Sequence, residues 1–252
     1  MTFDSYYWRS SRLSTPELER ARVLVATAHD RTSFALLLRS NDMAAVGIAF
    51  DQYHYADASS RHGSATPFGE YCSEVAARAR EVLRQPPSDS AGGIEAGANH
   101  ASALGALANL AEPEDAELIV QVFRRAAPSN LRFAAALAAR SVLENSISPN
   151  EQLISELEKV VFDESTASEE RRAALAALGR ARSEFATDAL LRVLHVSDPS
   201  LQASSALHLL DRDLPKYRTQ VEEIARTWPK DPPYPADEVI ELLAESSGVD
   251  GR

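Results

Sequence analysis

A short alanine- and leucine-rich segment recurs four times from residue 102 onward, and this recurrence constrains the fold more than any other feature. The four copies are SALGALANL (102–110), RFAAALAAR (132–140), ERRAALAAL (170–178) and QASSALHLL (202–210). Their aligned leucines, Leu107, Leu137, Leu175 and Leu207, are separated by 30, 38 and 32 residues. Such intervals are typical of arrays in which one supersecondary unit buries its apolar surface mainly against neighbouring copies.

Each copy is predicted to be the first helix of a helix–turn–helix unit. Alanine and leucine have high helix propensity, and small residues over a broad apolar arc let a neighbouring helix approach closely. A second stretch with helical periodicity follows each copy: AELIVQVFRR (116–125), EQLISELEKVVF (151–162), ATDALLRVLH (186–195) and YRTQVEEIAR (217–226). We therefore expect an all-α fold built from antiparallel helix pairs.

Residues 171–210 carry the pattern most clearly. Its elements are Ala174-Leu175, Gly179, Leu190-Leu191, Leu194, Asp198-Pro199 and Ala206-Leu207. This pattern resembles the HEAT-like repeats of the short bacterial type that also occur in phycobilisome lyases. The resemblance extends over about residues 99–228 and is weak before residue 85. It implies an α-α superhelix, a HEAT-like solenoid, and implies no single activity, because such scaffolds serve unrelated functions.

Proline, serine and glycine between the two regions predict a division of the chain. The stretch QPPSDSAGGIEAGANH (85–100) has the composition of a loop. We expect an N-terminal helical region of degenerate repeats or a cap (1–85), a linker (86–98), and HEAT-like repeats with a C-terminal capping helix (99–252). Upstream helices are expected near 15–28, 31–39, 42–57 and 67–84. Helix starts are predicted at Ser14-Thr15-Pro16-Glu17, Thr66-Pro67, Ser148-Pro149-Asn150-Glu151 and Asp198-Pro199.

The balance of acidic and basic residues restricts the kinds of partner that the protein is expected to bind. The chain has a net charge of -11, from 37 acidic and 26 basic residues. Residues 1–85 hold ten of each, so the whole acidic excess follows them. This balance argues against nucleic acid and anionic membranes as partners. One cysteine excludes an intrachain disulfide, and the N-terminal sequence MTFDSYYWRS does not have the pattern of a signal peptide. A cytoplasmic location is therefore expected.

The stretch DQYHYADASSRHG (51–63) contains the side chains best suited to catalysis or metal binding. Asp51 and His54 are three residues apart, so on a helix they share a face and could ligate a metal or orient a general base. A simpler interpretation makes them the polar flank of a helix whose buried face is Val46, Ala49, Phe50 and Tyr53. We favour the simpler interpretation, because no third ligand or nucleophile accompanies them, and expect neither a metal site nor a cofactor.

The leading functional hypothesis is a non-enzymatic protein-binding scaffold, in one version an inhibitor or immunity-type protein that masks a basic protein. The expected binding residues are exposed positions of the second helices: Gln121, Arg124, Glu156, Lys159, Asp188, Arg192, Glu223 and Arg226. An alternative is a bilin-lyase-like or other small-ligand enzyme that uses the aromatic N-terminal region around Tyr53, His54 and Tyr55. Self-association through Tyr6-Tyr7-Trp8 stays open as a further alternative.

Overall fold

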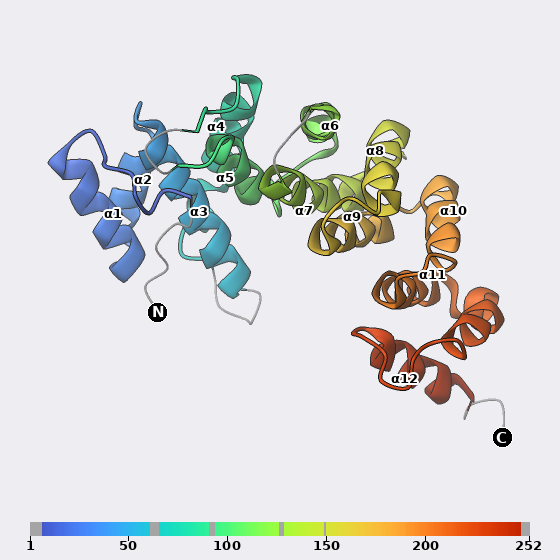
Figure 1. The fold of residues 1–252 in the computed structure, drawn as a ribbon. Coiled ribbons are helices and arrows are strands. Elements are labelled where there is room, and N and C mark those ends of the chain that lie inside the picture. The colour runs from blue at the N-terminus through green and yellow to red at the C-terminus, as the bar shows by residue number, and fades with distance from the viewer. Residues whose placement is uncertain (1–6, 61–65, 91–93, 126–128, 149, 248–252) are drawn as a thin grey trace. The chain divides into compact units, whose positions relative to one another are not determined.

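The computed structural model describes residues 7–60, 66–90, 94–125, 129–148 and 150–247. Within these ranges the chain is all-α and contains no β-strand, which confirms the all-α part of the predicted fold class, while the solenoid stays a prediction (Figure 1). Twelve α-helices and two short 3₁₀ turns are described. The helices are α1 (Pro16–Ala28), α2 (Arg31–Leu38), α3 (Met43–Ser60), α4 (Cys72–Arg84), α5 (Ala98–Leu107), α6 (Ala116–Arg124), α7 (Ser129–Asn145), α8 (Glu151–Phe162), α9 (Ser168–Arg180), α10 (Glu184–Val193), α11 (Pro199–Ala225) and α12 (Ala236–Ser247).

The helices group into two compact units, residues 1–142 and 143–252. The segment predicted to be a linker, 86–98, lies inside the first unit. There the Ser88 N–H donates to Asn99 Oδ1 at 2.8 Å, and the Gly97 N–H donates to Ser88 O at 2.7 Å. These bonds hold the described part of the segment against the start of α5. The predicted division into an N-terminal region, a linker and repeats stays a prediction.

The first unit is organised around α3 and α5, which pack against each other. The Trp8 indole is buried and donates from Nε1 to Ser102 Oγ of α5 at 2.9 Å. It also covers Gly47 of α3 so closely that a Cβ at that position would overlap the indole ring. Nearby, Phe34 stacks on Phe68 with ring centroids 4.1 Å apart. The segment before α1 is therefore part of the first core.

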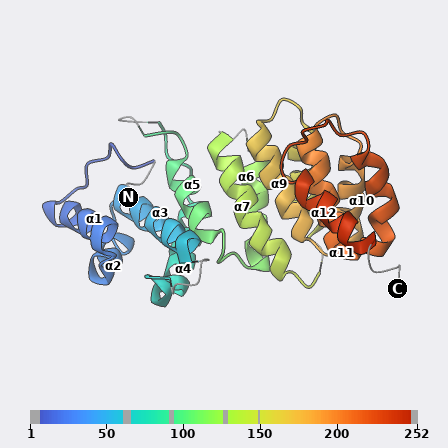
Figure 2. The ribbon, with the colours of Figure 1, turned by 90° about the horizontal axis from the view of Figure 1, so that it is seen from below.

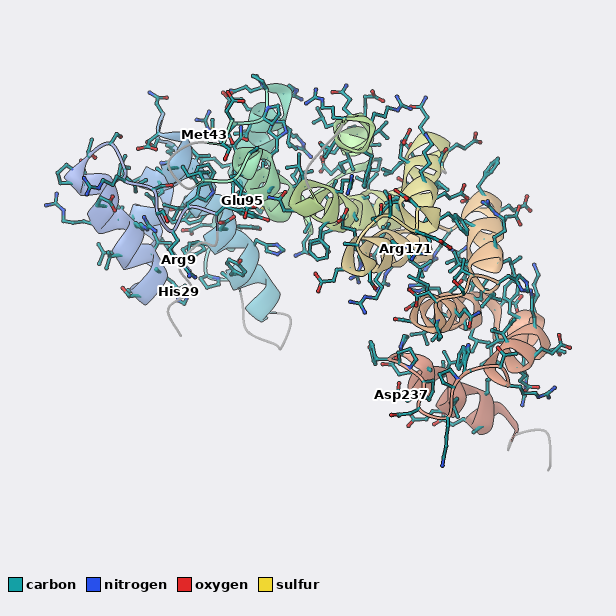
Figure 3. All side chains as sticks on the ribbon, viewed as in Figure 1. Arg9, His29, Met43, Glu95, Arg171 and Asp237 are labelled. Carbon is teal, nitrogen blue, oxygen red and sulfur yellow. The ribbon has the colours of Figure 1, made fainter. Side chains whose placement is uncertain are left out.

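In the second unit each helix packs against the next one or two helices along the chain. Helix α8 contacts α9 and α10, α9 contacts α10 and α11, and α12 packs on α11, over which it lies in Figure 2. Arg171 of α9, labelled in Figure 3, donates from Nε to Val161 O at 2.8 Å and lies 3.9 Å from the Asp198 carboxylate. Ser205 Oγ donates to Leu190 O at 2.6 Å. Polar side chains thus satisfy buried backbone carbonyls between neighbouring helices.

Two of the four predicted helix starts are confirmed. Thr15 caps α1 by accepting a hydrogen bond from the Leu18 N–H, and Pro16 is the first helical residue. Asp198 caps α11 by accepting from the N–H groups of Ser200 and Leu201, with a proline next. At both sites a short polar side chain that accepts a hydrogen bond is followed by a proline, which has no N–H to satisfy. The starts could therefore be predicted from the local sequence.

The other two starts differ from prediction. Phe68 is fully buried against Phe34, and the chain then makes a 3₁₀ turn (Gly69–Tyr71) before α4 begins at Cys72, so Thr66 does not cap the helix. Helix α8 begins after Asn150, whose side chain accepts from the Leu153 N–H, so Asn150 rather than Ser148 is the cap. Pro149 lies outside the described residues.

The two helices of the fourth predicted pair form one element, α11, with a bend. Asp213 has non-helical backbone angles (φ −161°, ψ 85°) inside this helix. Its carboxylate accepts from the Lys216 N–H at 3.1 Å, so Asp213 caps the second half as an ordinary N-cap would. The predicted segments 202–210 and 217–226 fall on opposite sides of this residue.

Candidate functional site

Most of the residues predicted to bind a partner are exposed on their helices. Seven of the eight are exposed: Gln121, Arg124, Lys159, Asp188, Arg192, Glu223 and Arg226. Glu156 is the exception, since it is 6% exposed on the buried side of α8 between Leu153 and Leu157. Its carboxylate oxygens accept from Lys159 Nζ at 3.0 Å. The expectation that Glu156 is exposed was therefore wrong, because the apolar stripe of α8 is wider than periodicity suggested.

Helices α8 and α10 together present one exposed surface in the second unit, which we call the outer face. Successive members on each helix are one, three or four residues apart, so each set lies on one side of its helix. They are Glu151, Gln152, Ser155 and Lys159 of α8, and Glu184, Phe185, Asp188 and Arg192 of α10. Arg192 joins the two helices, because it donates to Glu158 Oε1 at 2.7 Å and its guanidinium lies 5.1 Å from the centre of the Phe162 ring.

The outer face is acidic in effect, and it carries one large apolar side chain. Its two cations are engaged within the protein, Lys159 by Glu156 and Arg192 by Glu158. Glu151 and Asp188 form no ion pair with any residue that the structure describes. Phe185 is 54% exposed on α10, one turn from Asp188. The face therefore combines uncompensated carboxylates with an accessible aromatic ring.

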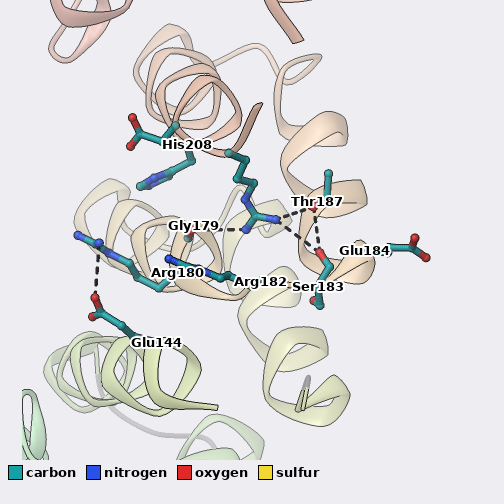
Figure 4. A pocket seen from close by; sticks show the side chains of 10 residues that line it. Glu144, Gly179, Arg180, Arg182, Ser183, Glu184, Thr187 and His208 are labelled. Atoms are coloured by element: carbon teal, nitrogen blue, oxygen red, sulfur yellow. Dashed lines mark hydrogen bonds and ion pairs between the residues drawn. The ribbon is translucent and has the colours of Figure 1, made fainter. Parts of the chain in front are cut away.

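A cavity of about 710 Å³ opens in the second unit (Figure 4). It is bounded by the end of α7, the end of α9, the start of α10 and the middle of α11. Its lining is Glu144, Gly179, Arg180, Arg182, Ser183, Glu184, Thr187, His208, Asp211 and Arg212. None of these residues was predicted as a site. Arg180 and Arg182, which follow Gly179 in the sequence, are the feature from which an anion site could have been predicted.

Arg212 forms one wall of this cavity and fixes its shape. Its guanidinium donates to the carbonyl oxygens of Leu178 at 3.1 Å and Ala181 at 2.6 Å, and to Thr187 Oγ1 at 2.5 Å. These bonds attach the end of α9 and the start of α10 to α11. They also satisfy carbonyls that the end of a helix leaves without partners. Burial of the guanidinium lowers the pKa of Arg212 from its usual value.

Other basic side chains gather on one side of the cavity. Arg180 lies 3.6 Å from the Glu144 carboxylate, and Arg182 is exposed and has no ion pair among the described residues. The His208 ring lies flat against Gly179, where an added Cβ would approach three ring atoms to 2.5 Å. Figure 4 shows Arg180, Arg182 and His208 on the same side, while Glu184 points away from them. Positive charge is thus concentrated locally in an acidic protein.

Residues 51–56, the part of the stretch whose burial the structure describes, are more buried than predicted. Tyr53 is 4% exposed, as expected, and Val46, Ala49 and Phe50 are buried with it. Asp51, expected on a polar flank, is 6% exposed, which corrects that interpretation. Burial raises the pKa of Tyr7 to about 12, with a smaller contribution from the negative charges of Asp51 and Glu95. The reason for the difference is tertiary, because the segment before α1 covers this end of α3.

The aromatic residues of that stretch do not line the cavity of the second unit. His54 and Tyr55 are half-buried, with ring centroids 5.8 Å apart, and Tyr53 contacts Phe34. The Asp57 side chain and residues 61–63 lie outside the described part of the chain. The small-ligand alternative built on Tyr53, His54 and Tyr55 therefore stays a prediction.

No group of three histidine, cysteine, aspartate or glutamate side chains in residues 7–60, 66–90, 94–125, 129–148 and 150–247 could hold a metal ion. Within the same ranges, every helix is too short or too polar to cross a membrane.

No protein-family model matches this chain, and comparison with curated proteins gave no match. The likeness to HEAT-like repeats accordingly rests on the sequence pattern of about residues 99–228.

Proposed function

We propose that this protein is a non-enzymatic scaffold that binds another protein through the second helices of HEAT-like repeats. The observation that carries the proposal is Phe185, an aromatic side chain 54% exposed on a face that is otherwise polar. Aromatic residues surrounded by polar ones are the usual anchors of protein interfaces, because they bury much area at low entropic cost.

The packing of the second unit supports the solenoid part of the proposal. Each helix contacts only the next one or two along the chain in the contacts described above. A solenoid needs this pattern, because every pair of helices must bury its apolar face against adjacent pairs. The second helix of a pair then offers its other side to a partner, as α8 and α10 offer the outer face.

The charges of the outer face favour a partner with a basic surface. Glu151 and Asp188 are uncompensated among the described residues, and the chain as a whole carries a net charge of -11. Complementary charge accelerates encounter and excludes acidic partners. A protein that masks a basic partner, as an inhibitor or immunity-type protein does, would have this combination of an acidic rim and an aromatic anchor.

Affinity capture from the source cell with matched variants tests the proposal. Phe185→Ser removes the anchor, and Asp188→Lys reverses a rim charge. Phe133→Ser, at an exposed phenylalanine of the first unit, is the control. Burying half of a phenylalanine side chain is worth about 1–1.5 kcal/mol, so Phe185→Ser should weaken the complex about tenfold.

The expected result is a basic protein that the unmodified chain and Phe133→Ser retain equally, and that the two outer-face variants lose. Retention of the partner by all four chains would place the interface elsewhere. Recovery of no protein above background would refute a stable protein partner.

A further inference from the structure

We propose that the cavity of the second unit binds a compact oxyanion, a small molecule that carries two or more carboxylate or phosphate groups. This inference can be tested separately from the outer face, because its basic side chains are not members of that face and it predicts a different ligand; Glu184 is common to both. Its basis is the arrangement of Arg180, Arg182, His208 and Arg212.

The first observation is a half-buried cation without a carboxylate partner. Every hydrogen bond of Arg212 goes to a neutral oxygen, that of a backbone carbonyl or of the Thr187 hydroxyl. It has no ion pair with any residue that the structure describes. Electrostatic interactions are stronger where solvent is partly excluded, so the charge of Arg212 would act more strongly on a bound anion than the same charge in bulk water. An anion that enters the cavity would provide the missing counter-charge.

The second observation is that two further guanidinium groups remain available to a ligand. Arg182 is exposed and forms no ion pair among the described residues, and its side chain lies beside those of Arg180 and His208 in Figure 4. Arg180 is 3.6 Å from Glu144, which is too long for a good hydrogen bond. The planar fork of a guanidinium matches the paired oxygens of a carboxylate or phosphate. Arg180 and Arg182 can therefore donate hydrogen bonds to the ligand, while Arg212 fixes the end of α9 and the start of α10 that form the wall of the cavity.

The remaining lining restricts the size of the ligand. A volume of about 710 Å³ falls within the range typical of small-molecule sites. Glu144, Glu184 and Asp211 also line the cavity, so a long polyanion would meet repulsion. Glu184 points away from Arg180 and Arg182, so a compact anion beside these arginines would compete with Glu144 for Arg180. Nucleic acid and extended acidic peptides fit this distribution poorly.

Isothermal titration calorimetry on the full chain tests the proposal with citrate and pyrophosphate as probes. Sodium chloride at matched ionic strength corrects for screening. Arg182→Ala removes an available donor, and Arg180→Ala is a second variant. The control is Arg172→Ala, which removes an exposed arginine of α9 that does not line the cavity. Circular dichroism of each variant checks that the fold is retained.

We expect saturable one-site binding of at least one probe, with affinity about tenfold lower in each cavity variant and unchanged in Arg172→Ala. Binding of citrate alone would identify a carboxylate ligand, and binding of pyrophosphate alone would identify a phosphate ligand. Binding of both would show that the cavity recognises oxyanions of either kind. Absence of saturable binding of either probe would overturn the proposal. An equal loss of affinity in Arg172→Ala would also overturn it, because general surface charge would then explain the effect.

Discussion

Replacing Gly179 with alanine is expected to destabilise the second unit, although alanine is the better helix former. Gly179 lies in the last turn of α9, beneath the His208 ring of α11. A Cβ at this position would approach Cγ, Cδ2 and Nε2 of His208 to 2.5 Å, well inside the optimal separation of about 3.5 Å. Either the imidazole turns into the cavity or the two helices separate.

The size of the effect follows from two opposing contributions. Alanine in place of glycine stabilises a helix by up to about 1 kcal/mol. Overpacking of a filled contact costs about 1–3 kcal/mol. The free energy of unfolding should therefore fall by about 0–2 kcal/mol in Gly179→Ala. In a His208→Ala background the overlap is absent, and Gly179→Ala should instead stabilise by up to about 1 kcal/mol.

A double-mutant cycle measures the contact directly. The chain has two tryptophans, so urea unfolding followed by fluorescence in a Trp8→Phe background reports on Trp228 of the second unit. We expect a coupling energy of about 1–3 kcal/mol between Gly179 and His208. Equal stabilisation by Gly179→Ala in both backgrounds would show that the ring does not lie against this glycine.

Three further substitutions test contacts of the first unit. Ser102→Ala should cost about 1–3 kcal/mol in urea unfolding, because the buried Trp8 N–H loses its acceptor, and the cost should shrink when Trp8→Phe is also present. Arg80→Lys should lower the melting temperature by circular dichroism despite retaining the charge, since lysine cannot reproduce the two bonds of 2.7 and 2.9 Å to the buried Asp115; an unchanged melting temperature would contradict this. Burial lowers the pKa of His100, so the unfolded chain takes up a proton first and stability should fall as pH drops below about 6.5. His100→Gln should make the free energy of unfolding less dependent on pH below about 6.5. An unchanged dependence would show that groups other than His100 cause it.

The helices could be predicted from sequence because their signals are local. Alanine and leucine at helical spacing located α5, α7, α9 and the first half of α11, and caps such as Thr15 and Asp198 located the starts of α1 and α11. Each of these signals acts within a few residues, so no knowledge of tertiary packing was needed.

The candidate site could not be predicted because it depends on helices that meet only in three dimensions. The cavity joins Glu144, Gly179 and Arg212, which are separated by more than thirty residues at each step. The burial of Asp51 has the same origin, because Tyr7, which precedes α1 in the sequence, lies close to it. The burial of Glu156 has a different origin, since it lies between Leu153 and Leu157 on α8 and its partner Lys159 belongs to the same helix.

The bend at Asp213 has a consequence for how this chain can vary in length. A five-residue connection, 163–167, separates α8 from α9, whereas a single non-helical residue separates the two halves of α11. One extra residue rotates a following helix by about 100° about its axis. An insertion beside Asp213 would therefore turn Tyr217 and Val221 out of the interior, while the longer connection could absorb it. Related chains should differ in length at 163–167 and keep a constant residue count across the bend.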